Sequence, residues 1–413
     1  MSISNEKLST AVQQLHRYLL QHHWHGNALS GPDSGVRWNF KLGRFVKSYL
    51  NFVPWRDNYT FMQTQGYWIM SNWLMAELWG DDQYRNLAMD CSNYLVAAQQ
   101  PAGHWVYPPL PSRIGKIATV EGNIATIGLL TSYRQTHDPA LVNAATRWHE
   151  FLENKIGFQE RNGLLAINYW ANEQNGAVPN NTTLTLWTLA ELTAATHDAR
   201  YMAPSAAMMA FLQRAQMTSG ELPYEIGHTE AEHRPHFLCF QYNAFEFLDL
   251  TRYYQLTADQ QVLPVLQKLA RFLATGLTAD GAARFNCHQV APETIYYTAA
   301  VATALSQATA LGLGDYRALA EQGYNWVLAQ QKANGSMAFF SRGNYGLLTD
   351  RRAYPRNLSM ILYHLLRELQ TRRQAAPATL QTAPKARSSA VIPMRIVELQ
   401  PAVAYETTTL THF

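Results

Sequence analysis

Two stretches of the sequence concentrate side chains that bind anions or exchange protons. The first precedes the last apolar run of the chain and contains Asp350, Arg351, Arg352, Arg356 and Asn357. Guanidinium groups beside the positive N-terminal end of a helix suit a carboxylate or a phosphate, which arginine binds through paired hydrogen bonds. The cluster therefore predicts an anion site with Arg352, Arg356 and Asn357 as ligands. The alternative is a salt-bridge network around Asp350 that holds the fold closed.

The second stretch lies in the middle of the chain. It carries His228 and His236 in a loop rich in glutamate, followed by Gln241 and Tyr242. Histidine exchanges protons near neutral pH, and a tyrosine beside it can act as an acid. We predict that His228, His236 and Tyr242 are acid–base catalysts and that Gln241 contacts the ligand.

A repeat of about 57 residues organises the chain around these stretches. Each unit opens with a short acidic turn, continues through an Ala-rich helical segment to a glycine-centred turn, and ends with a second apolar helix. The acidic turns fall at Asp81, Asp138, Asp198, Asp259 and Asp315, and the glycines are Gly103, Gly163, Gly220, Gly281 and Gly335. Two helices per unit indicate stacked helical hairpins, because one hairpin cannot bury its apolar face alone.

The repeat predicts twelve helices in two sets. The helices that open the repeats are amphipathic and lie near residues 6–22, 82–98, 139–155, 199–216, 258–274 and 315–331. The helices that follow the glycine turns are more uniformly apolar and lie near residues 60–79, 121–135, 181–196, 241–256, 293–311 and 355–371. A uniformly apolar helix is buried on all sides, so the second set forms an inner layer. Asp198 is predicted as an N-cap, and Asn180 or Asn181 as the cap of the helix after Pro179.

The predicted fold is an all-α (α/α)6 toroid, in which six helical hairpins form an inner and an outer helix layer. It covers residues 1–373 as a single domain. Residues 374–413 are rich in Ala, Pro and Thr and are predicted to be a disordered, low-complexity tail.

One motif resembles a known family. The sequence QQPAGHW, from Gln99 to Trp105, is similar to the Gln-x-x-x-Gly-x-Trp repeat of triterpene cyclases, and weaker copies begin at Gln216 and Gln331. With the repeat, this resembles the α/α-toroid superfamily of terpenoid cyclases, protein prenyltransferases and many polysaccharide lyases, epimerases and glycosidases. The resemblance covers about residues 5–371. It implies a ring whose inner helices begin at one face.

The loops differ in length at the two faces of such a ring. The acidic turns are minimal, whereas the loops that contain the glycines are long and rich in polar and aromatic residues. We therefore expect a concave ligand-binding mouth at the glycine face, where the inner helices begin. Further candidates at this face are Asn58, Trp105, Glu121, Asn123, Asn181 and Glu293, although Asn at a helix start can also be a cap.

These residue types favour a carbohydrate-directed protein acting on an acidic, uronate-containing saccharide. Arg and Asn would neutralise the uronate carboxylate, His or Tyr would abstract the C5 proton, and Tyr would protonate the leaving oxygen. This resembles the residue usage of toroid polysaccharide lyases and epimerases. A hydrolase would instead use two carboxylates, such as Glu121 and Glu293. The alternatives are an isoprenoid cyclase, although the chain lacks an Asp-x-Asp-Asp motif, and a non-catalytic toroid that binds a partner.

The composition of the chain limits the kinds of binding partner that we expect. A formal net charge of +3 over 413 residues does not suggest nucleic-acid binding, and no apolar run reaches transmembrane length. The N-terminus lacks an apolar signal core, so we expect a cytoplasmic protein with a small-molecule or oligosaccharide ligand. Cys239, Cys287 and His288 resemble, in residue types only, the zinc ligands of lanthionine-forming cyclases and prenyltransferases, but the sequences around them lack the patterns of those families. No metal, cofactor, disulfide or particular oligomeric state is predicted.

Overall fold

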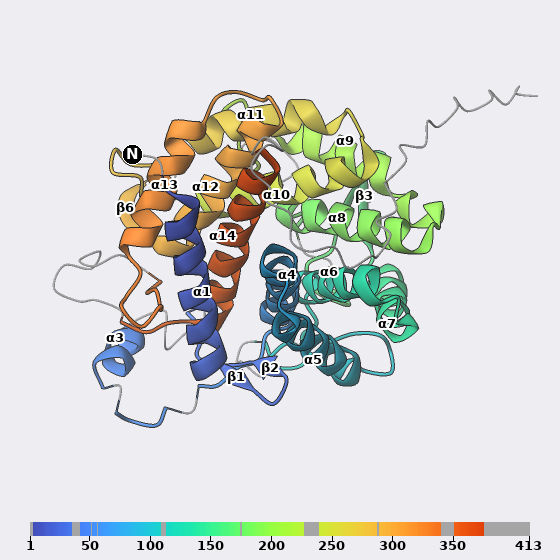
Figure 1. The fold of residues 1–413 in the computed structure, drawn as a ribbon. Helices are drawn as coiled ribbons and strands as arrows, with labels where there is room; N and C mark the ends of the chain where they lie inside the picture. Colours follow the sequence, from blue (N-terminus) through green and yellow to red (C-terminus); the bar gives the residue numbers. More distant parts are fainter. Residues whose placement is uncertain are drawn as a thin grey trace, which may run out of the picture. The chain divides into compact units, whose positions relative to one another are not determined.

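Twelve helices form two layers in the computed structural model (Figure 1). It describes residues 3–34, 42–50, 52–55, 57–108, 113–173, 176–226, 239–286, 289–339 and 351–375. Within this part of the chain, six inner helices pack each against the next, and the last packs against the first. They are α4 (Met62–Trp79), α6 (Thr119–Thr136), α8 (Pro179–Thr196), α10 (Cys239–Thr257), α12 (Ile295–Ala310) and α14 (Pro355–Ala375).

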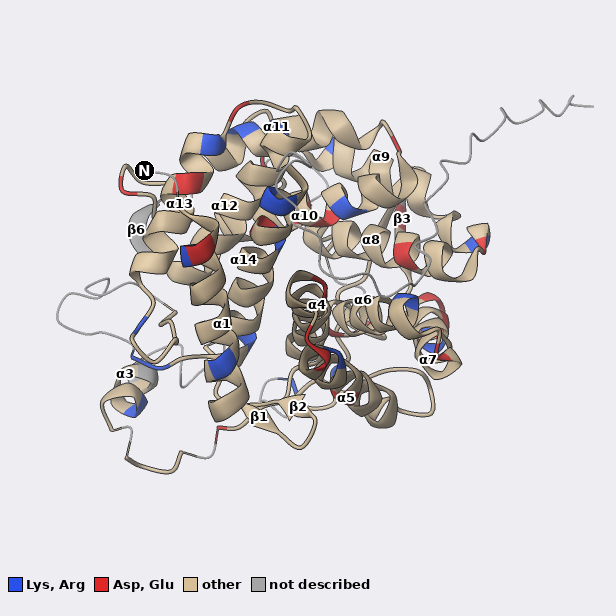
Figure 2. Cartoon of the chain, in the orientation of Figure 1, with Lys and Arg blue, Asp and Glu red and all other residues tan. Residues whose placement is uncertain are grey.

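The outer layer consists of one helix packed against each inner helix. Its members are α1 (Asn5–His22), α5 (Asp82–Ala98), α7 (Pro139–Phe151), α9 (Ser205–Ala215), α11 (Val262–Ala274) and α13 (Arg317–Ala329). The predicted all-α toroid of six hairpins is confirmed. Figure 2 shows that charged residues of both signs are interspersed over the outer helices and also occur on inner helices such as α10 and α14. No described helix combines the length and apolarity needed to cross a membrane.

The pattern of apolar residues explains the two layers. In α1 the buried Leu8, Val12, Leu15 and Leu19 recur at intervals of three and four residues, so only one stripe of the helix faces inward. In α12, by contrast, every residue of 295–305 is buried. A helix of the first kind covers a core, whereas a helix of the second kind belongs inside it.

Helix ends differ between the layers. Asp81, Asp138 and Asp198 accept a hydrogen bond from the backbone N–H two residues on, at 2.8, 2.9 and 3.0 Å. This confirms Asp198 as a cap, although it begins the short 3-10 helix η2 (Ala199–Met202), and α9 starts only after Pro204. The inner helices α4, α6, α8 and α12 have no side-chain cap.

The predicted asparagine cap of α8 is wrong. Pro179 is the first residue of this helix, so Asn180 and Asn181 lie within its first turn, after the N-cap residue Val178. Their side chains are therefore not used to cap α8, and both remain available for contacts toward the axis or the core.

Four of the five repeated glycines perform the same task. Gly103, Gly220, Gly281 and Gly335 have φ between +87° and +97°, which L-residues rarely adopt. Each turn also lies directly on the next outer helix, where a Cβ atom would collide with the backbone carbonyl of Arg147, Lys268, Gln322 or Gln14 respectively. Glycine is thus required twice over at these turns.

The glutamine of the Gln-x-x-x-Gly motif also links each glycine turn to the next outer helix. Gln99 donates from Nε2 to the carbonyl oxygen of Gly103 at 2.9 Å and to that of Ala144 in α7 at 2.8 Å. Gln216 and Gln331 make the equivalent pairs of bonds, so the weaker copies of the motif keep its geometry. The bond from Gln331 reaches Ala11 of α1, which joins the last repeat to the first helix.

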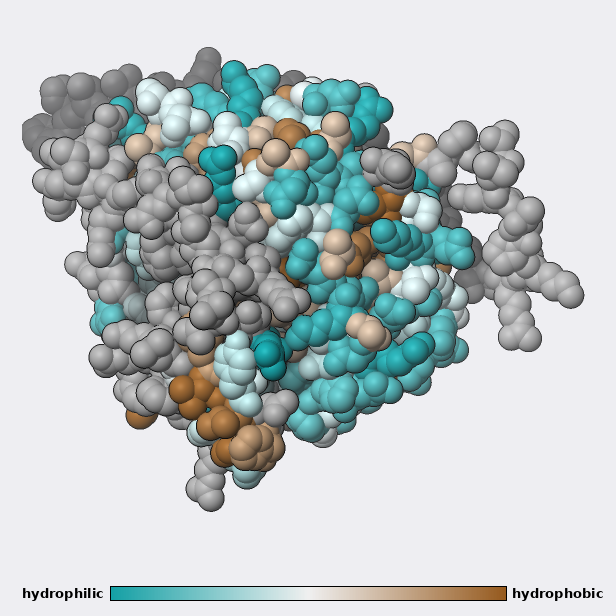
Figure 3. Space-filling model, turned by 90° about the vertical axis from the view of Figure 1, so that its left-hand side faces the viewer, coloured by the Kyte–Doolittle hydropathy of each residue, from teal (hydrophilic) through white to brown (hydrophobic). Residues whose placement is uncertain are grey.

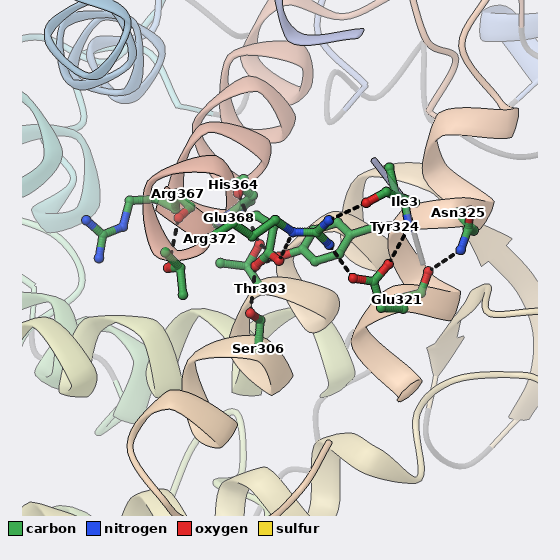
Figure 4. Close-up of polar contacts among 11 residues, drawn as sticks. Ile3, Thr303, Ser306, Glu321, Tyr324, Asn325, His364, Arg367, Glu368 and Arg372 are labelled. Atoms are coloured by element: carbon green, nitrogen blue, oxygen red, sulfur yellow. Dashed lines mark hydrogen bonds and ion pairs between the residues drawn. The ribbon is translucent and has the colours of Figure 1, made fainter. Parts of the chain in front are cut away.

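Polar contacts reinforce this closing seam (Figure 4). Arg372 of α14 donates to Glu321 of α13 at 2.5 Å, to Glu368 at 2.6 Å and to the carbonyl oxygen of Ile3 at 2.7 Å. The backbone N–H of Ile3 donates to Glu321 at 2.9 Å. The segment before α1 is thereby fastened to the last two helices.

We expect Gly103→Ala to lower the free energy of unfolding by roughly 2–4 kcal/mol, through the unfavourable φ and the collision with the Arg147 carbonyl. Gly163→Ala is the matched control, because Gly163 has φ +76° but open space around the Cβ position. It should cost only about 1 kcal/mol. Chemical denaturation of the two variants measures the difference, and equal losses would contradict the close approach at Gly103.

Several elements were not predicted from the sequence. The described residues contain three two-stranded antiparallel hairpins: β1 (Trp24–His25) with β2 (Ala28–Leu29), β3 (Phe158–Arg161) with β4 (Leu164–Ile167), and β5 (Ala283–Asn286) with β6 (Gln289–Thr294). Gly163 lies in the turn of the second hairpin, with Phe158 opposite Ile167, and so differs from the other repeated glycines. A five-residue π-helix, η1 (Leu152–Ile156), replaces the predicted end of the α7 helix.

The short helix α3 (Leu42–Tyr49) is also additional to the predicted twelve. Around it Val46, Tyr49, Leu50 and Phe52 are exposed. α3 lies on the left of Figure 1, and Figure 3, which shows that side of the molecule, has apolar side chains gathered at its lower left. The predicted disordered tail falls almost entirely outside the described residues and stays a prediction.

Candidate functional site

A cavity of about 350 Å³ lies at the ends where the inner helices begin, which is within the range of small-ligand sites. The first turns of all six inner helices line it, through Gln63, Glu121, Asn180, Tyr242, Tyr296 and Arg356 among others. Loops at the same end add Asp33, Tyr107, Arg113, Tyr169 and Phe339. This is the face at which the sequence predicts a ligand-binding mouth.

Aromatic side chains form much of the wall. Six tyrosines and two phenylalanines line the cavity, and the described part of the wall contains no tryptophan. A tyrosine offers an apolar ring face together with a hydroxyl group that can donate or accept a hydrogen bond. The wall therefore suits a ligand that has both apolar faces and polar edges.

Glu121 is a buried carboxyl group in this wall. Its Oε2 atom accepts a hydrogen bond at 2.9 Å from the backbone N–H of Gln63, so that the carboxyl group of α6 takes the place of a cap on α4. Its Oε1 atom has no hydrogen-bond partner among the described residues. Burial raises the pKa of Glu121 to about 7, against the lowering effect of the Gln63 N–H. Such a group can both give and take a proton near neutral pH.

Packing behind α6 fixes the position of Glu121. The indole ring of Trp148 in α7 occupies the space that a Cβ atom on Gly122 would need. Its Nε1 donates to Asn123 Oδ1 at 2.9 Å, and Asn123 Nδ2 donates to Thr185 Oγ1 at 2.9 Å. The two residues that follow Glu121 are thus held by buried contacts.

A second carboxylate in the cavity is paired with an arginine. Arg356 Nε lies 2.7 Å from Asp33 Oδ2, and Arg356 Nη2 donates to Oδ1 at 2.9 Å. The same guanidinium lies over the ring of Phe61, 4.4 Å from its centroid. Asp33 is almost fully buried, so the arginine is what makes its negative charge tolerable there.

Arg113 brings a positive charge that has no such partner. Its Nη1 donates to the Tyr107 hydroxyl at 2.6 Å, and its guanidinium carbon lies 5.3 and 5.5 Å from the ring centroids of Tyr107 and Trp170. No carboxylate of the described residues lies within ion-pair distance of it. The rings of Tyr107 and Trp170 therefore hold the Arg113 guanidinium at the cavity and leave its positive charge available to a ligand.

The cavity wall also contains hydrogen-bond acceptors that have no donor among the described residues. Asn180 Oδ1 and Gln241 Oε1, like Glu121 Oε1, are buried and lack a partner among the described groups. Buried polar atoms are normally hydrogen-bonded, so unpaired acceptors in a cavity wall point to a ligand or water that donates. A ligand with several hydroxyl groups meets this requirement.

Five of the residues singled out from the sequence line the cavity: Tyr242, Glu121, Gln241, Arg356 and Asn357. Burial raises the pKa of Tyr242 to about 12, so that it keeps its proton at neutral pH. Asn357 accepts a hydrogen bond from Ser34 Oγ at 3.2 Å. His228, His236 and the side chain of Glu293 lie outside the described residues.

The other candidates occupy places outside this lining. Arg352 pairs with Asp57 at 2.6 Å, and Lys47 pairs with the same carboxylate at 3.0 Å, which forms a buried ionic cluster. Asn58 is exposed, Asn181 is buried beside the wall, and Asn123 lies in the core. Trp105 is also a core residue, and its Nε1 donates to the Leu95 carbonyl oxygen at 2.8 Å. Among the described residues, no group of three His, Cys, Asp or Glu side chains is arranged to hold a metal ion.

Asp33, Arg113 and Asn180 were not among the predicted site residues. Asp33 stands in a Gly- and Pro-containing loop that reads as an ordinary turn, and its partner Arg356 is 323 positions away. Arg113 gave a weak signal, as a lone arginine in one of the long polar loops at the expected mouth.

Comparisons with known proteins place the fold. No protein-family model and no curated protein sequence matches the chain. Several solved structures, in contrast, are similar to this chain. A cellobiose 2-epimerase from Bacillus thermoamylovorans matches with a TM-score of 0.69 and 10% identity over 88% of this chain and 100% of that one. A possible member of the GH105 family from Salmonella enterica matches with a TM-score of 0.64 and 14% identity over 89% and 95%.

A polysaccharide lyase is similar over 90% of this chain and 99% of its own, with a TM-score of 0.62 and 10% identity. At such low identity the likeness concerns the fold and not the reaction. The chain has the six-hairpin α/α-toroid fold that glycosyl hydrolases, polysaccharide lyases and sugar epimerases share.

Proposed function

We propose that the protein is a carbohydrate-active enzyme that hydrolyses a glycosidic bond in an acidic saccharide. The observation that carries the proposal is the contrast between two carboxyl groups in one cavity. Glu121 is buried without a cation in direct contact and has a pKa of about 7, whereas Asp33 is held as an ion pair with Arg356. A buried carboxyl group without a cation in contact and a carboxylate bound to an arginine, both in one cavity, are suited to act as acid and base.

The chemistry follows from this contrast. Glu121 gives its proton to the glycosidic oxygen as the bond to the anomeric carbon breaks, and the sugar departs as an alcohol. The Asp33 carboxylate takes a proton from water, whose oxygen adds to the anomeric carbon.

The substrate class is inferred from the rest of the cavity. The unpaired acceptors of Asn180 and Gln241 match sugar hydroxyl groups, and the tyrosine rings match the apolar faces of sugars. Arg113 matches the carboxylate of a uronate, in place of the role predicted for Arg356, which already binds Asp33. The similar structures of a GH105-like protein, a polysaccharide lyase and a cellobiose 2-epimerase support a saccharide as ligand. An isoprenoid would leave these polar groups unpaired, so the cyclase alternative is not favoured.

A lyase or an epimerase is the second candidate, because Tyr242 lines the cavity and keeps its proton at neutral pH. Incubation of uronate-containing oligosaccharides in oxygen-18-labelled water separates the reactions. Hydrolysis places the label at the new reducing end, elimination yields an unsaturated uronate without label, and epimerisation in heavy water exchanges the proton of the inverted carbon. Product of either of the last two kinds would overturn the hydrolase proposal.

Arg113→Gln is expected to weaken the binding of a uronate oligosaccharide by roughly 10–100-fold, because one charge-assisted hydrogen-bonding partner is lost. Binding of the corresponding neutral oligosaccharide should change less than threefold. Isothermal titration of both ligands measures the contrast, with Arg214→Gln on outer helix α9 as a control away from the cavity. Equal weakening for the charged and the neutral ligand would contradict the role of Arg113.

A further inference from the structure

A second, smaller chamber lies along the inner helices beyond the ligand cavity. Its volume is about 20 Å³, and five inner helices contribute to its wall. Tyr67, Phe245 and Asp249 line both spaces, so the two chambers share a partition. Its lining residues include Asp249, Arg252, Gln307, His364 and Arg367.

Two arginines, Arg252 and Arg367, line this chamber. Arg252 lies 3.5 Å from Glu191, which is also paired with Arg134. Arg367 donates to Gln370 Oε1 at 2.7 Å, and no carboxylate of the described residues lies within ion-pair distance of it. Figure 4 shows its guanidinium directed away from the cluster of Glu368 and Arg372.

The one acidic group in the wall does not offset these arginines. Burial raises the pKa of Asp249 well above its usual range, which favours the neutral acid over the carboxylate. Burial also lowers the pKa of Arg367, and the neighbouring Arg252 lowers it further. Arg252 and Arg367 thus line the same small space, and Glu191, the carboxylate paired with Arg252, is shared with Arg134.

The wall also contains polar atoms without partners. Arg252 Nε and both ring nitrogens of His364 are buried and unpaired in the described structure, as is Gln307 Oε1. His364 is only 2% exposed, and burial lowers its pKa to about 3, so it is a neutral imidazole with one N–H donor. Donors thus converge from α10 and α14 on a space with room for one small particle.

We propose that this chamber is a binding site for a small monovalent anion of the size of chloride. A space of 20 Å³ exceeds what one water molecule needs but is far smaller than a sugar or nucleotide site. The Nε–H of Arg252, the guanidinium of Arg367 and the N–H of His364 supply its hydrogen bonds, and the negative charge of the anion is attracted by the two arginines. Its position beside Asp249 also favours the protonated form of that acid in the partition.

Two measurements on the full-length protein test the site. Crystals grown in sodium bromide should show an anomalous scattering peak in the chamber, between Arg252 and Arg367. In solution, sodium chloride should raise the midpoint of thermal unfolding by about 2 °C over sodium methanesulfonate of the same concentration, with saturation. Methanesulfonate is monovalent but too large for the chamber.

Variants make the test specific. Arg367→Gln should abolish the difference between chloride and methanesulfonate. Arg134→Gln should retain it, because Arg134 contacts the same Glu191 but does not line the chamber. Equal midpoints of the wild type in both salts, a bromide peak only elsewhere, or an unchanged chloride response in Arg367→Gln would each overturn the proposal. The bromide experiment uses the wild-type protein and so does not depend on the folding of any variant.

Discussion

Replacing Glu121 by glutamine is expected to lower kcat/KM on an acidic oligosaccharide by about 10²–10⁴-fold, the usual contribution of a general acid. Glutamine keeps the size of the side chain and can still accept the hydrogen bond from the Gln63 N–H, so the fold should survive. What is lost is the proton for the leaving oxygen.

The pH dependence gives the same prediction a second readout. A general acid works only in its protonated form, and the pKa of Glu121 is about 7. The kcat/KM of the wild type should therefore fall as the pH rises through about 7. The residual activity of Glu121→Gln should show no such fall. Glu173→Gln is the matched control, because Glu173 forms a half-exposed pair with Lys116 near the cavity without lining it. Activity of Glu121→Gln within threefold of the wild type would rule out the general-acid role.

Replacing Arg356 by methionine is expected to lower the free energy of unfolding by about 3–5 kcal/mol, because the buried carboxylate of Asp33 is left without its partner. The double variant Asp33→Asn/Arg356→Met should recover much of this loss, since it no longer buries an unpaired charge. Chemical denaturation of the wild type, the two single variants and the double variant measures the coupling between them.

An exposed ion pair supplies the control for this cycle. Arg85 and Asp82 lie 2.9 Å apart on α5, and both side chains are more than half exposed. Arg85→Met should therefore change the stability by less than about 1 kcal/mol. If Arg356→Met behaved like Arg85→Met, the ion pair with Asp33 would not be what holds Arg356, and the assignment of the anion site to Arg113 would lose its basis.

The fold was predictable because its signals are local and repeated. An acidic cap, an apolar stripe and a glycine at positive φ each leave a mark within a few residues, and five copies make the pattern plain. The Gln-x-x-x-Gly turns are the clearest case, since even the weak copies at Gln216 and Gln331 keep both of their hydrogen bonds. The strands and α3 were missed because they interrupt the repeat without a period of their own.

The site was only partly predictable, because the charge and the hydrogen bonds of its residues depend on partners that are far apart in the sequence. Arg356 and Arg113 are both arginines near the mouth. Only the structure shows that Arg356 is paired with Asp33, whereas Arg113 has no carboxylate partner in the part of the chain that the structure describes. Asn180 was interpreted as a cap because Asn favours helix starts. Once Pro179 begins the helix, the same residue faces the cavity.

The closing seam of the ring has a consequence for how the chain is made. The first helix is held by residues that are synthesised last: Gln331 bonds to Ala11 across 320 positions, and Arg372 bonds to Ile3 across 369. During translation the apolar stripe of α1 therefore stays without its final neighbours until almost the whole chain has left the ribosome. Contacts of such long sequence separation form slowly and leave apolar surface exposed meanwhile. Nascent chains stalled before α14 should accordingly bind chaperones through α1.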